Sequence, residues 1–208
     1  VVFQDLNTAL DPSTGLPYSA RAWAWSNTPF NEVFFFFPRA STSATQPDFY
    51  VKFNTLEGVW DYGPMDRTCG IDQSLLGMPI PAAATGLIYE HEVSNNADGQ
   101  PIGWYFETGW FQIAEGEEIA FVDWLLPDAK WGDFGGAQTA TMDITLYSVY
   151  YPGDTPQTHG PEATTISTQY TNPRLRGRLA KMRVGGNDLN SFVRLGGIRY
   201  RWAPDGRL

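Results

Sequence analysis

Two glutamates separated by one residue are the best catalytic candidates in this chain. Glu90 and Glu92 lie in Leu87–Val93, which we expect to be a strand, so both carboxylates would project from one face, about 6.5–7 Å apart. That distance is close to the separation of the two carboxyl groups in inverting glycosidases. Paired glutamates are also common on solvent-facing strands, so a glycosidase is kept only as an alternative function. His91 would point to the opposite face, where a packed or surface role is expected.

Other kinds of chemistry find little support in the residue types and their spacing. Asp98 with Glu90 and Glu92 could ligate a cation, but no EF-hand spacing is present, and the Asn95–Gly99 cluster fits a turn better. A Gly-x-Ser-x-Gly motif, a phosphate-binding loop and a dinucleotide fingerprint are all missing from the sequence. The single cysteine, Cys69, excludes a disulfide within the chain and is expected to be a buried thiol. We therefore predict no catalytic residues, no metal site and no bound cofactor.

Five arginines near the C-terminus are candidates for a subunit interface. Arg174, Arg176 and Arg178 alternate along an expected strand, so they would project from one face in steps of about 6.6 Å. Arg199 and Arg201 alternate in the same way in the last expected strand. Arginines at this spacing can face solvent, pair with carboxylates of a neighbouring protein, or contact the phosphates of DNA.

The charge of the chain is distributed unevenly. Residues 1–173 contain 5 Lys/Arg and 21 Asp/Glu, whereas residues 174–208 contain 9 Lys/Arg and 2 Asp/Glu. The formal net charge of −9 argues against a general nucleic-acid-binding protein. A basic C-terminal segment on an acidic body therefore favours an acidic protein partner over phosphate.

These candidate residues would have to be positioned by strands and turns, because helical periodicity is hard to find. Period-two alternation is clearest where Ala140, Met142, Ile144 and Leu146 share one face, as expected of a half-buried antiparallel strand. The expected strands are Val33–Phe37, Phe49–Asn54, Val59–Tyr62, Leu87–Val93, Gly103–Ile113, Ile119–Leu126, Thr139–Tyr151, Ile166–Tyr170, Leu175–Val184 and Phe192–Trp202.

The segments between the expected strands carry turn and loop residues, and one of them suggests a domain boundary. Asn95–Gly99 suits a hairpin loop, Gly132–Gly136 a flexible loop, and Pro152–Pro161 a polar connection. A Pro- and Ala-rich stretch before residue 86 divides short aromatic strands from longer ones. We predict an all-β protein, with a propeller-like or meander region over residues 1–85 and an antiparallel β-sandwich over residues 86–208.

Length and composition set the broad class of the protein. The chain has 208 residues, of which 42% are hydrophobic and 15% aromatic, enough to form a core and too many for a disordered chain. No apolar run approaches the roughly 20 residues of a membrane-spanning helix, so no membrane anchor is expected. Because the chain starts at Val1, we expect it to be trimmed or part of a longer chain.

Several strings of residues, in order along the chain, resemble the tail hub or nozzle proteins of short-tailed bacteriophages, also described as packaged-DNA stabilisation or head-completion proteins. One string begins Asn31-Glu32-Val33, continues with aromatic residues and ends at Pro38. A second runs from Tyr50 to Gly63 and places a Leu-Glu pair and a Trp before a Tyr-Gly turn. Further matching strings are Leu87–Val93, Tyr105–Gly109, Arg174–Arg178 and Trp202–Arg207. Family members are usually longer, with an extended N-terminal part that this sequence lacks.

The resemblance implies a structural function in the virion rather than catalysis. Such proteins form a homo-oligomeric ring, commonly hexameric, below the portal and adaptor. The ring continues the DNA channel, helps to retain and deliver packaged DNA without sequence-specific binding, and anchors fibre, spike or plug proteins. The expected location is the phage tail, after assembly in the host cytoplasm. The alternatives are a carbohydrate-binding β-sandwich module and a glycosidase.

Overall fold

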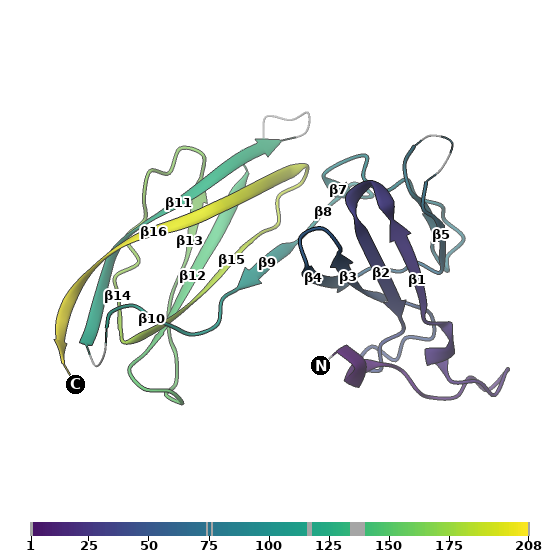
Figure 1. Cartoon of the computed structure of the whole chain (residues 1–208), viewed down its shortest axis with the longest axis horizontal. Coiled ribbons are helices and arrows are strands. Elements are labelled where there is room, and N and C mark those ends of the chain that lie inside the picture. Colours follow the sequence, from purple (N-terminus) through teal and green to yellow (C-terminus); the bar gives the residue numbers. More distant parts are fainter. Residues whose placement is uncertain (1, 74, 76, 116–117, 134–139, 208) are drawn as a thin grey trace. The chain divides into compact units, whose positions relative to one another are not determined.

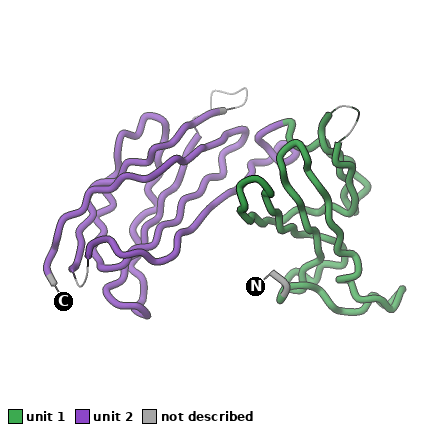
Figure 2. The backbone as a smooth tube through the Cα atoms, in the orientation of Figure 1, with its two compact units in different colours: residues 1–93 green, residues 94–208 purple. Residues whose placement is uncertain are grey.

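The computed structural model describes residues 2–73, 75, 77–115, 118–133 and 140–207, and these residues form an all-β protein. Its strands pair antiparallel in several sheets, which confirms the predicted fold class. The helical elements of the described residues are three short 3₁₀ segments, η1 (Val2–Asp5), η2 (Tyr18–Arg21) and η3 (Thr28–Phe30). None of them is long and apolar enough to cross a membrane. The chain divides into two compact units, residues 1–93 and 94–208 (Figure 2).

The first unit is built on a four-stranded meander in which each strand pairs with the next one along the chain (Figure 1). The strands are β1 (Trp23–Asn27), β2 (Glu32–Phe37), β3 (Phe49–Asn54) and β4 (Val59–Pro64), and a separate pair is formed by β5 (Cys69–Ile71) and β6 (Ile80–Ala82). Strands β2, β3 and β4 lie where they were predicted, while β1 was missed. Cys69 lies at the start of β5 and is exposed, not buried as expected.

The segment 86–93 belongs to the first unit, whereas the sequence placed it after the domain boundary. The amides of Tyr89 and His91 donate to the carbonyls of Pro81 and Pro79, at 2.9 and 3.0 Å. Proline has no N–H, so Pro79 and Pro81 can accept these hydrogen bonds but cannot donate any to residues 86–93. The predicted strand Leu87–Val93 is therefore wrong, and only an isolated bridge from Ala82 to Ile88 is present.

The second unit contains two antiparallel sheets and a short hairpin. One sheet has the order β10 (Phe111–Gln112), β15 (Leu179–Gly186), β12 (Thr141–Val149) and β13 (Gln157–Thr165), and β9 (Trp104–Glu107) also pairs with β15. The other sheet has the order β14 (Leu175–Gly177), β11 (Glu118–Asp133) and β16 (Ser191–Arg207). The hairpin joins β7 (Asn96–Ala97) to β8 (Gln100–Pro101). Its turn residues Asp98 and Gly99 have φ of 52° and 76°, in agreement with the predicted hairpin loop.

One apolar core joins the two sheets of this unit, which makes it a β-sandwich. Strand β12 contributes the alternating residues Met142, Ile144 and Leu146, as its sequence predicted, and Asp143 between them is exposed. The opposing sheet contributes Ala120, Val122, Leu125 and Leu175. The core positions are spaced by two along β12, whereas in β11 the register shift between Val122 and Trp124 makes the step from Val122 to Leu125 three residues.

Several expected elements of this unit differ from the structure. The expected strand Leu175–Val184 is two strands in different sheets, β14 and β15, and the chain crosses between them at Arg178. A Cβ on Gly177 would lie 2.8 Å from Ser148 Cβ, so this crossing needs a glycine. The expected strand Ile166–Tyr170 is wrong, and β13 instead lies largely within the expected polar connection.

The remaining differences concern the length and continuity of strands. The expected strand Gly103–Ile113 is interrupted between β9 and β10, whereas β11 and β16 are longer than predicted. The first two residues of the expected flexible loop, Gly132 and Asp133, are the last residues of strand β11, and positions 134–136 lie outside the described residues. Thr139, the first residue of the expected strand Thr139–Tyr151, also lies outside them.

Replacing Ile144 by alanine should lower the free energy of unfolding by about 2–5 kcal/mol, because the residue is 2% exposed and a cavity would remain. Asp143→Ala, on the exposed face of the same strand, should change it by no more than about 0.5 kcal/mol. Chemical denaturation of the two variants measures both values. Equal stabilities for the two would contradict the assignment of the sandwich core.

Candidate functional site

One face of the meander in the first unit carries a group of partly or largely exposed apolar side chains, which we call the aromatic face. Its members are Phe35, Val51, Phe53, Trp60 and Tyr62, which are paired across neighbouring strands in the order β2, β3, β4. Trp60 is 64% exposed and Tyr62 58%. The Trp60 ring lies 4.7 Å from that of Phe53 and 6.5 Å from that of Phe35, so the rings form one continuous surface.

A groove of about 680 Å³ runs over this face. It is lined by Leu6, Ala22, Ala24, Phe35, Phe37, Val51, Trp60 and Tyr62, and also by Trp23 and Phe36, which pack in the core on the other side of the sheet. The only polar side-chain atoms among them are two indole nitrogens and one hydroxyl, and the indole of Trp23 already donates to the carbonyl of Arg67 at 2.9 Å. The groove therefore offers apolar contact with very little hydrogen bonding.

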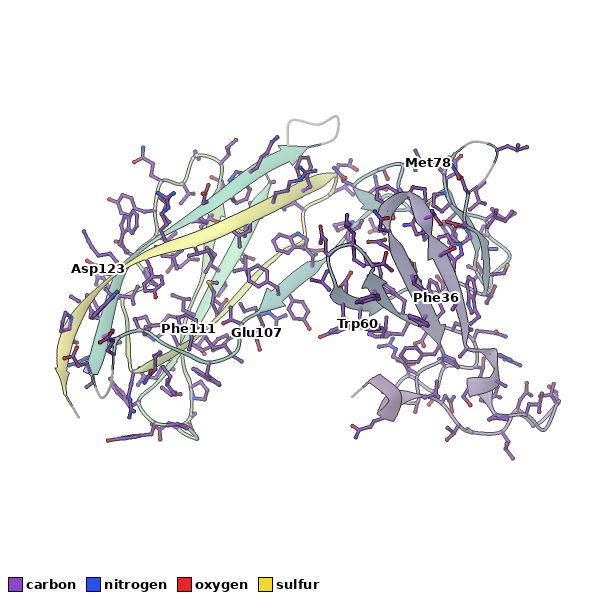
Figure 3. All side chains as sticks on the ribbon, viewed as in Figure 1. Phe36, Trp60, Met78, Glu107, Phe111 and Asp123 are labelled. Atoms are coloured by element: carbon purple, nitrogen blue, oxygen red, sulfur yellow. The ribbon has the colours of Figure 1, made fainter. Side chains whose placement is uncertain are left out.

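The opposite face of the same sheet is apolar as well, but it is buried. Trp25, Phe34 and Phe36 form a core, with Trp23 and Tyr50 packed against it. The rings of Phe34 and Phe36 stack at 5.7 Å, and those of Trp23 and Phe36 at 5.0 Å. Strands that are apolar on both faces are typical of sheets that are covered on both sides. Figure 3 shows the side chains of the sheet around Phe36 and Trp60.

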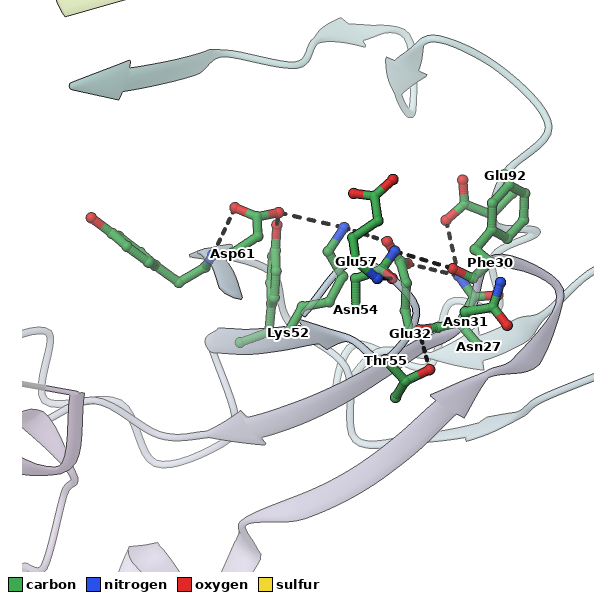
Figure 4. A network of polar contacts seen from close by, with 12 residues as sticks. Asn27, Phe30, Asn31, Glu32, Lys52, Asn54, Thr55, Glu57, Asp61 and Glu92 are labelled. Atoms are coloured by element: carbon green, nitrogen blue, oxygen red, sulfur yellow. Dashed lines mark hydrogen bonds and ion pairs between the residues drawn. The ribbon is translucent and has the colours of Figure 1, made fainter. Parts of the chain in front are cut away.

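A polar network lies at one end of this sheet (Figure 4). The ammonium of Lys52 lies 2.8 Å from the Glu32 carboxylate and 3.4 Å from that of Asp61. The amide nitrogen of Asn27 donates to both Glu32 and Glu92, at 3.2 Å each. The network thus brings together three carboxylates and one cationic side chain.

The charges of the network shift several pKa values. Burial alone would lower the pKa of Lys52, but the carboxylates of Glu32 and Asp61 outweigh it and raise that pKa. Partial burial, and then the charge of Glu32, raise the pKa of the Glu92 carboxyl group. Glu92 is exposed as a whole residue, so solvent moderates this second effect.

The two glutamates predicted as a pair are not arranged as the sequence suggested. Glu92 has φ of 63°, in the left-handed region, and neither residue lies in a strand. Glu90 is exposed and outside the network, whereas Glu92 meets Glu32, 60 positions earlier, through Asn27. No local spacing could have indicated Glu32 or Asn27, because the contact depends on how residues 86–93 return to the sheet.

The imagined cation site of Asp98, Glu90 and Glu92 is not formed either. Asp98 takes part in the hairpin turn of the second unit, while the glutamates belong to the first. Over the described ranges of the chain, no three His, Cys, Asp or Glu side chains are grouped so that they could hold a metal ion.

His91 has a packing role within the first unit. Its Nε2 accepts a hydrogen bond from Arg67 Nε at 3.1 Å, and its ring meets the Trp25 ring edge-on at 5.5 Å. The Arg67 guanidinium in turn lies 4.0 Å from the centre of the Tyr89 ring. Burial and the nearby Arg67 charge lower the pKa of His91 to about 4. The imidazole is therefore neutral at pH 7 and helps to hold residues 86–93 in place.

The C-terminal arginines do not form one basic face. Arg174 has φ of 49° and precedes β14, Arg176 lies in β14, and Arg178 is half-buried at the crossing to β15. The guanidinium of Arg178 has a buried Nε without a hydrogen-bond partner. The predicted alternation along one strand is wrong because the strand ends at Gly177.

The acidic partners of the other arginines lie in the same unit. Arg201 binds Asp123 through two hydrogen bonds, of 2.6 and 2.9 Å. Arg176 pairs with Asp205 at 2.5 Å, and Arg199 lies 4.0 Å from Asp128. Arg176 and Arg201, which were predicted to contact a neighbouring subunit, are thus neutralised by carboxylates of their own unit.

His91→Gln should reduce the loss of stability of this protein on acidification. The pKa of His91 is about 4 in the folded protein and 6.5 in the unfolded chain. The neutral imidazole therefore contributes its full stabilisation above pH 6.5, and this contribution is lost as the pH falls toward 4. The effect should be on the order of 1–2 kcal/mol, allowing for partial exposure. Urea unfolding at pH 7 and pH 4.5 measures it. His159→Gln is the comparison in the second unit: burial also lowers the pKa of His159, so it should change the pH dependence in the same direction. An identical pH dependence in the wild type and His91→Gln would refute the assignment.

Comparison with known proteins gives this site no relatives. The chain matches no protein-family model and no curated protein. The function must therefore be argued from the geometry just described, in which an aromatic face and a polar network occupy one small sheet.

Proposed function

We propose that this chain is a virion structural protein, a subunit of a homo-oligomeric tail hub or nozzle ring of the kind found in short-tailed bacteriophages. In this role it continues the DNA channel below the portal and adaptor in the phage tail, helps to retain and deliver DNA, and contacts fibre, spike or plug proteins. The observation that carries the proposal is the aromatic face, which is the feature of the first unit best suited to a subunit contact.

The size and chemistry of the aromatic face favour a protein partner. The three strands that carry the aromatic face, of six residues each, cover about 15 by 20 Å, or roughly 300 Å² of sheet. An exposed apolar patch of a few hundred Å² is often functional. Trp60 and Tyr62 are also of the residue types that dominate interface energies.

The same face argues against carbohydrate binding as the main function. A sugar presents hydroxyl groups that need hydrogen-bond partners once they lose water. The groove lining offers almost none, although Trp60 and Tyr62 could stack on a sugar ring. A carbohydrate-binding module therefore remains the second candidate, and the aromatic stacking surface is the observation in its favour.

The charge distribution fits a ring in which DNA passes without adhesion. The net charge of −9 would repel DNA from a channel wall. Because Arg176 and Arg201 are paired with acids of their own unit, we assign the main subunit contact to the aromatic face. Arg174, Arg178 and Arg199 remain secondary interface candidates.

Trp60→Glu should convert the wild-type multimer into a folded monomer, because the charge would lose its water in the subunit interface. Leu56→Glu is the matched control: Leu56 is 78% exposed in the turn before β4, outside the aromatic face, and the variant should assemble normally. Light scattering at low and high salt gives the mass, and an apolar contact should resist salt.

Two results would contradict this assignment. A salt-sensitive multimer unaffected by Trp60→Glu would place the contact on charged residues instead. A wild-type monomer that binds glycans, with binding lost in Trp60→Ala, would establish the carbohydrate-binding alternative.

A further inference from the structure

Strand β16 of the second unit has one edge that no described strand covers. It is the terminal strand of the sheet order β14, β11, β16, and within the described residues its ladder partner is β11. An uncovered edge presents backbone N–H and C=O groups to which a further strand can bond. This edge is therefore a candidate binding surface for an extended segment of another protein.

Pro127 identifies the backbone groups that point to the free edge. It is paired with Ile198 of β16, and because proline has no N–H the two residues cannot exchange hydrogen bonds. Pairs of this kind alternate with hydrogen-bonded pairs along an antiparallel ladder, so Tyr200 and its partner Leu125 form another. Leu125 agrees, since its N–H and C=O both bond to Thr171 on its other side. The N–H and C=O groups of Ile198 and Tyr200 consequently point away from β11.

The side chains along this edge differ between the two faces of the sheet. Ile198 and Tyr200 face the other sheet and line a cavity of about 80 Å³, which Phe111 of β10 also lines. Arg199 and Arg201 alternate with them and lie on the opposite face, where their side chains are 73% and 66% exposed. The edge is thus apolar on one face and cationic on the other.

Arg199 is only loosely paired within its own unit. Its guanidinium lies 4.0 Å from the Asp128 carboxylate, whereas Arg201 is held by two hydrogen bonds to Asp123. A carboxylate directly opposite Arg199 on an added strand gains a cross-strand ion pair. The cationic face therefore favours acidic residues in the added segment.

The cavity favours apolar residues on the other face of that segment. Strands β10 and β16 are each terminal in their sheets, and residues of both line the cavity, so it lies on the side of the sandwich where the edge is free. An apolar cavity of about 150 Å³ can hold benzene. This smaller cavity has room for the end of one aliphatic side chain.

We propose that the free edge of β16 binds an extended segment of a partner protein in which bulky apolar and acidic residues alternate. The segment adds antiparallel, which is the slightly more stable pairing. Its apolar residues exchange backbone hydrogen bonds with Ile198 and Tyr200 and direct a side chain to the cavity, while its acidic residues lie opposite Arg199 and Arg201. Main-chain bonds supply the affinity and the alternating side chains the specificity. The inference does not depend on the proposed assembly function.

Titration of the whole chain in a calorimeter with the end-capped synthetic peptide Thr-Ile-Glu-Leu-Glu-Ile-Glu-Thr tests the proposal. We expect saturable binding. A peptide with lysine in place of each glutamate should bind at least about tenfold more weakly, because it places like charges opposite the arginines. A peptide with alanine in place of the leucine should bind about fivefold more weakly, because it buries less apolar surface.

Methylation of the peptide backbone tests the strand pairing itself. In the antiparallel arrangement the amides of the apolar residues donate to the carbonyls of Ile198 and Tyr200, so N-methylation of these amides should abolish binding. The amides of the glutamates point away from β16, and their methylation should weaken binding by less than about threefold.

Two protein variants separate this edge from general electrostatic attraction. Arg199→Glu should weaken binding of the glutamate peptide by about tenfold or more. Arg183→Glu is the matched control: Arg183 is an exposed residue of β15, which is paired on both sides, and the variant should bind as the wild type does. Thermal unfolding checks that both variants are folded.

Four outcomes would overturn the proposal. Absence of binding, or equal binding of the glutamate and lysine peptides, would show that the edge does not select an acidic strand. Equal losses in Arg199→Glu and Arg183→Glu would indicate diffuse attraction. Binding that tolerates methylation of the apolar residues would exclude antiparallel strand addition. Slow hydrogen exchange of the Ile198 and Tyr200 amides in the protein alone, lost on dilution, would assign the edge to a second copy of the chain instead.

Discussion

The run of four phenylalanines in β2, Phe34–Phe37, is the constraint on which the first unit depends. Side chains alternate across a strand, so Phe34 and Phe36 must lie on one face while Phe35 and Phe37 lie on the other. One pair completes a buried core with Trp25. The other makes the second face apolar as well, and Phe35 remains 44% exposed on it. Most of this sheet therefore carries apolar side chains on both of its faces.

The polar groups of this unit are consequently displaced to the end of the sheet. Glu32 opens β2, just before the aromatic run, and Asn27 closes β1 opposite to it. Glu92 reaches the same place because residues 86–93 return beside β6 and are held by the Arg67–His91 contact. The aromatic strand and the carboxylate network are therefore two results of one pattern. Apolar residues occupy most of the sheet, and its charged side chains gather toward one end, where Lys52 of β3 pairs with Asp61 of β4.

The sequence predicted the elements whose alternation and turns are local. Strands β2, β3 and β12 and the hairpin turn at Asp98 and Gly99 were found in this way. It missed β13, whose residues are mostly exposed and polar, because an edge strand of that kind has no hydrophobic period. It also read β14 and β15 as one strand, since the crossing between two sheets at Gly177 has no local signature.

The candidate site was harder to predict than the fold. The aromatic composition was visible, but which rings would be exposed depends on what packs against each face of the sheet. Glu92 was predicted to pair with Glu90, its neighbour in sequence, whereas in the structure Asn27 links it to Glu32. The arginine series lost its regularity for a similar reason: one residue, Arg178, turns inward where the chain changes sheets.

The long ribbon of β11 and β16 has a consequence for solubility. Among the described strands, β16 pairs with β11 only, so its outer edge presents backbone groups that could recruit a strand from another molecule. Three register shifts interrupt the ribbon, and Arg194, Arg199 and Arg201 are spread along β16. Irregular pairing and repeated positive charge both discourage edge-to-edge stacking. The basic segment thus discourages aggregation through the exposed edge of this sheet.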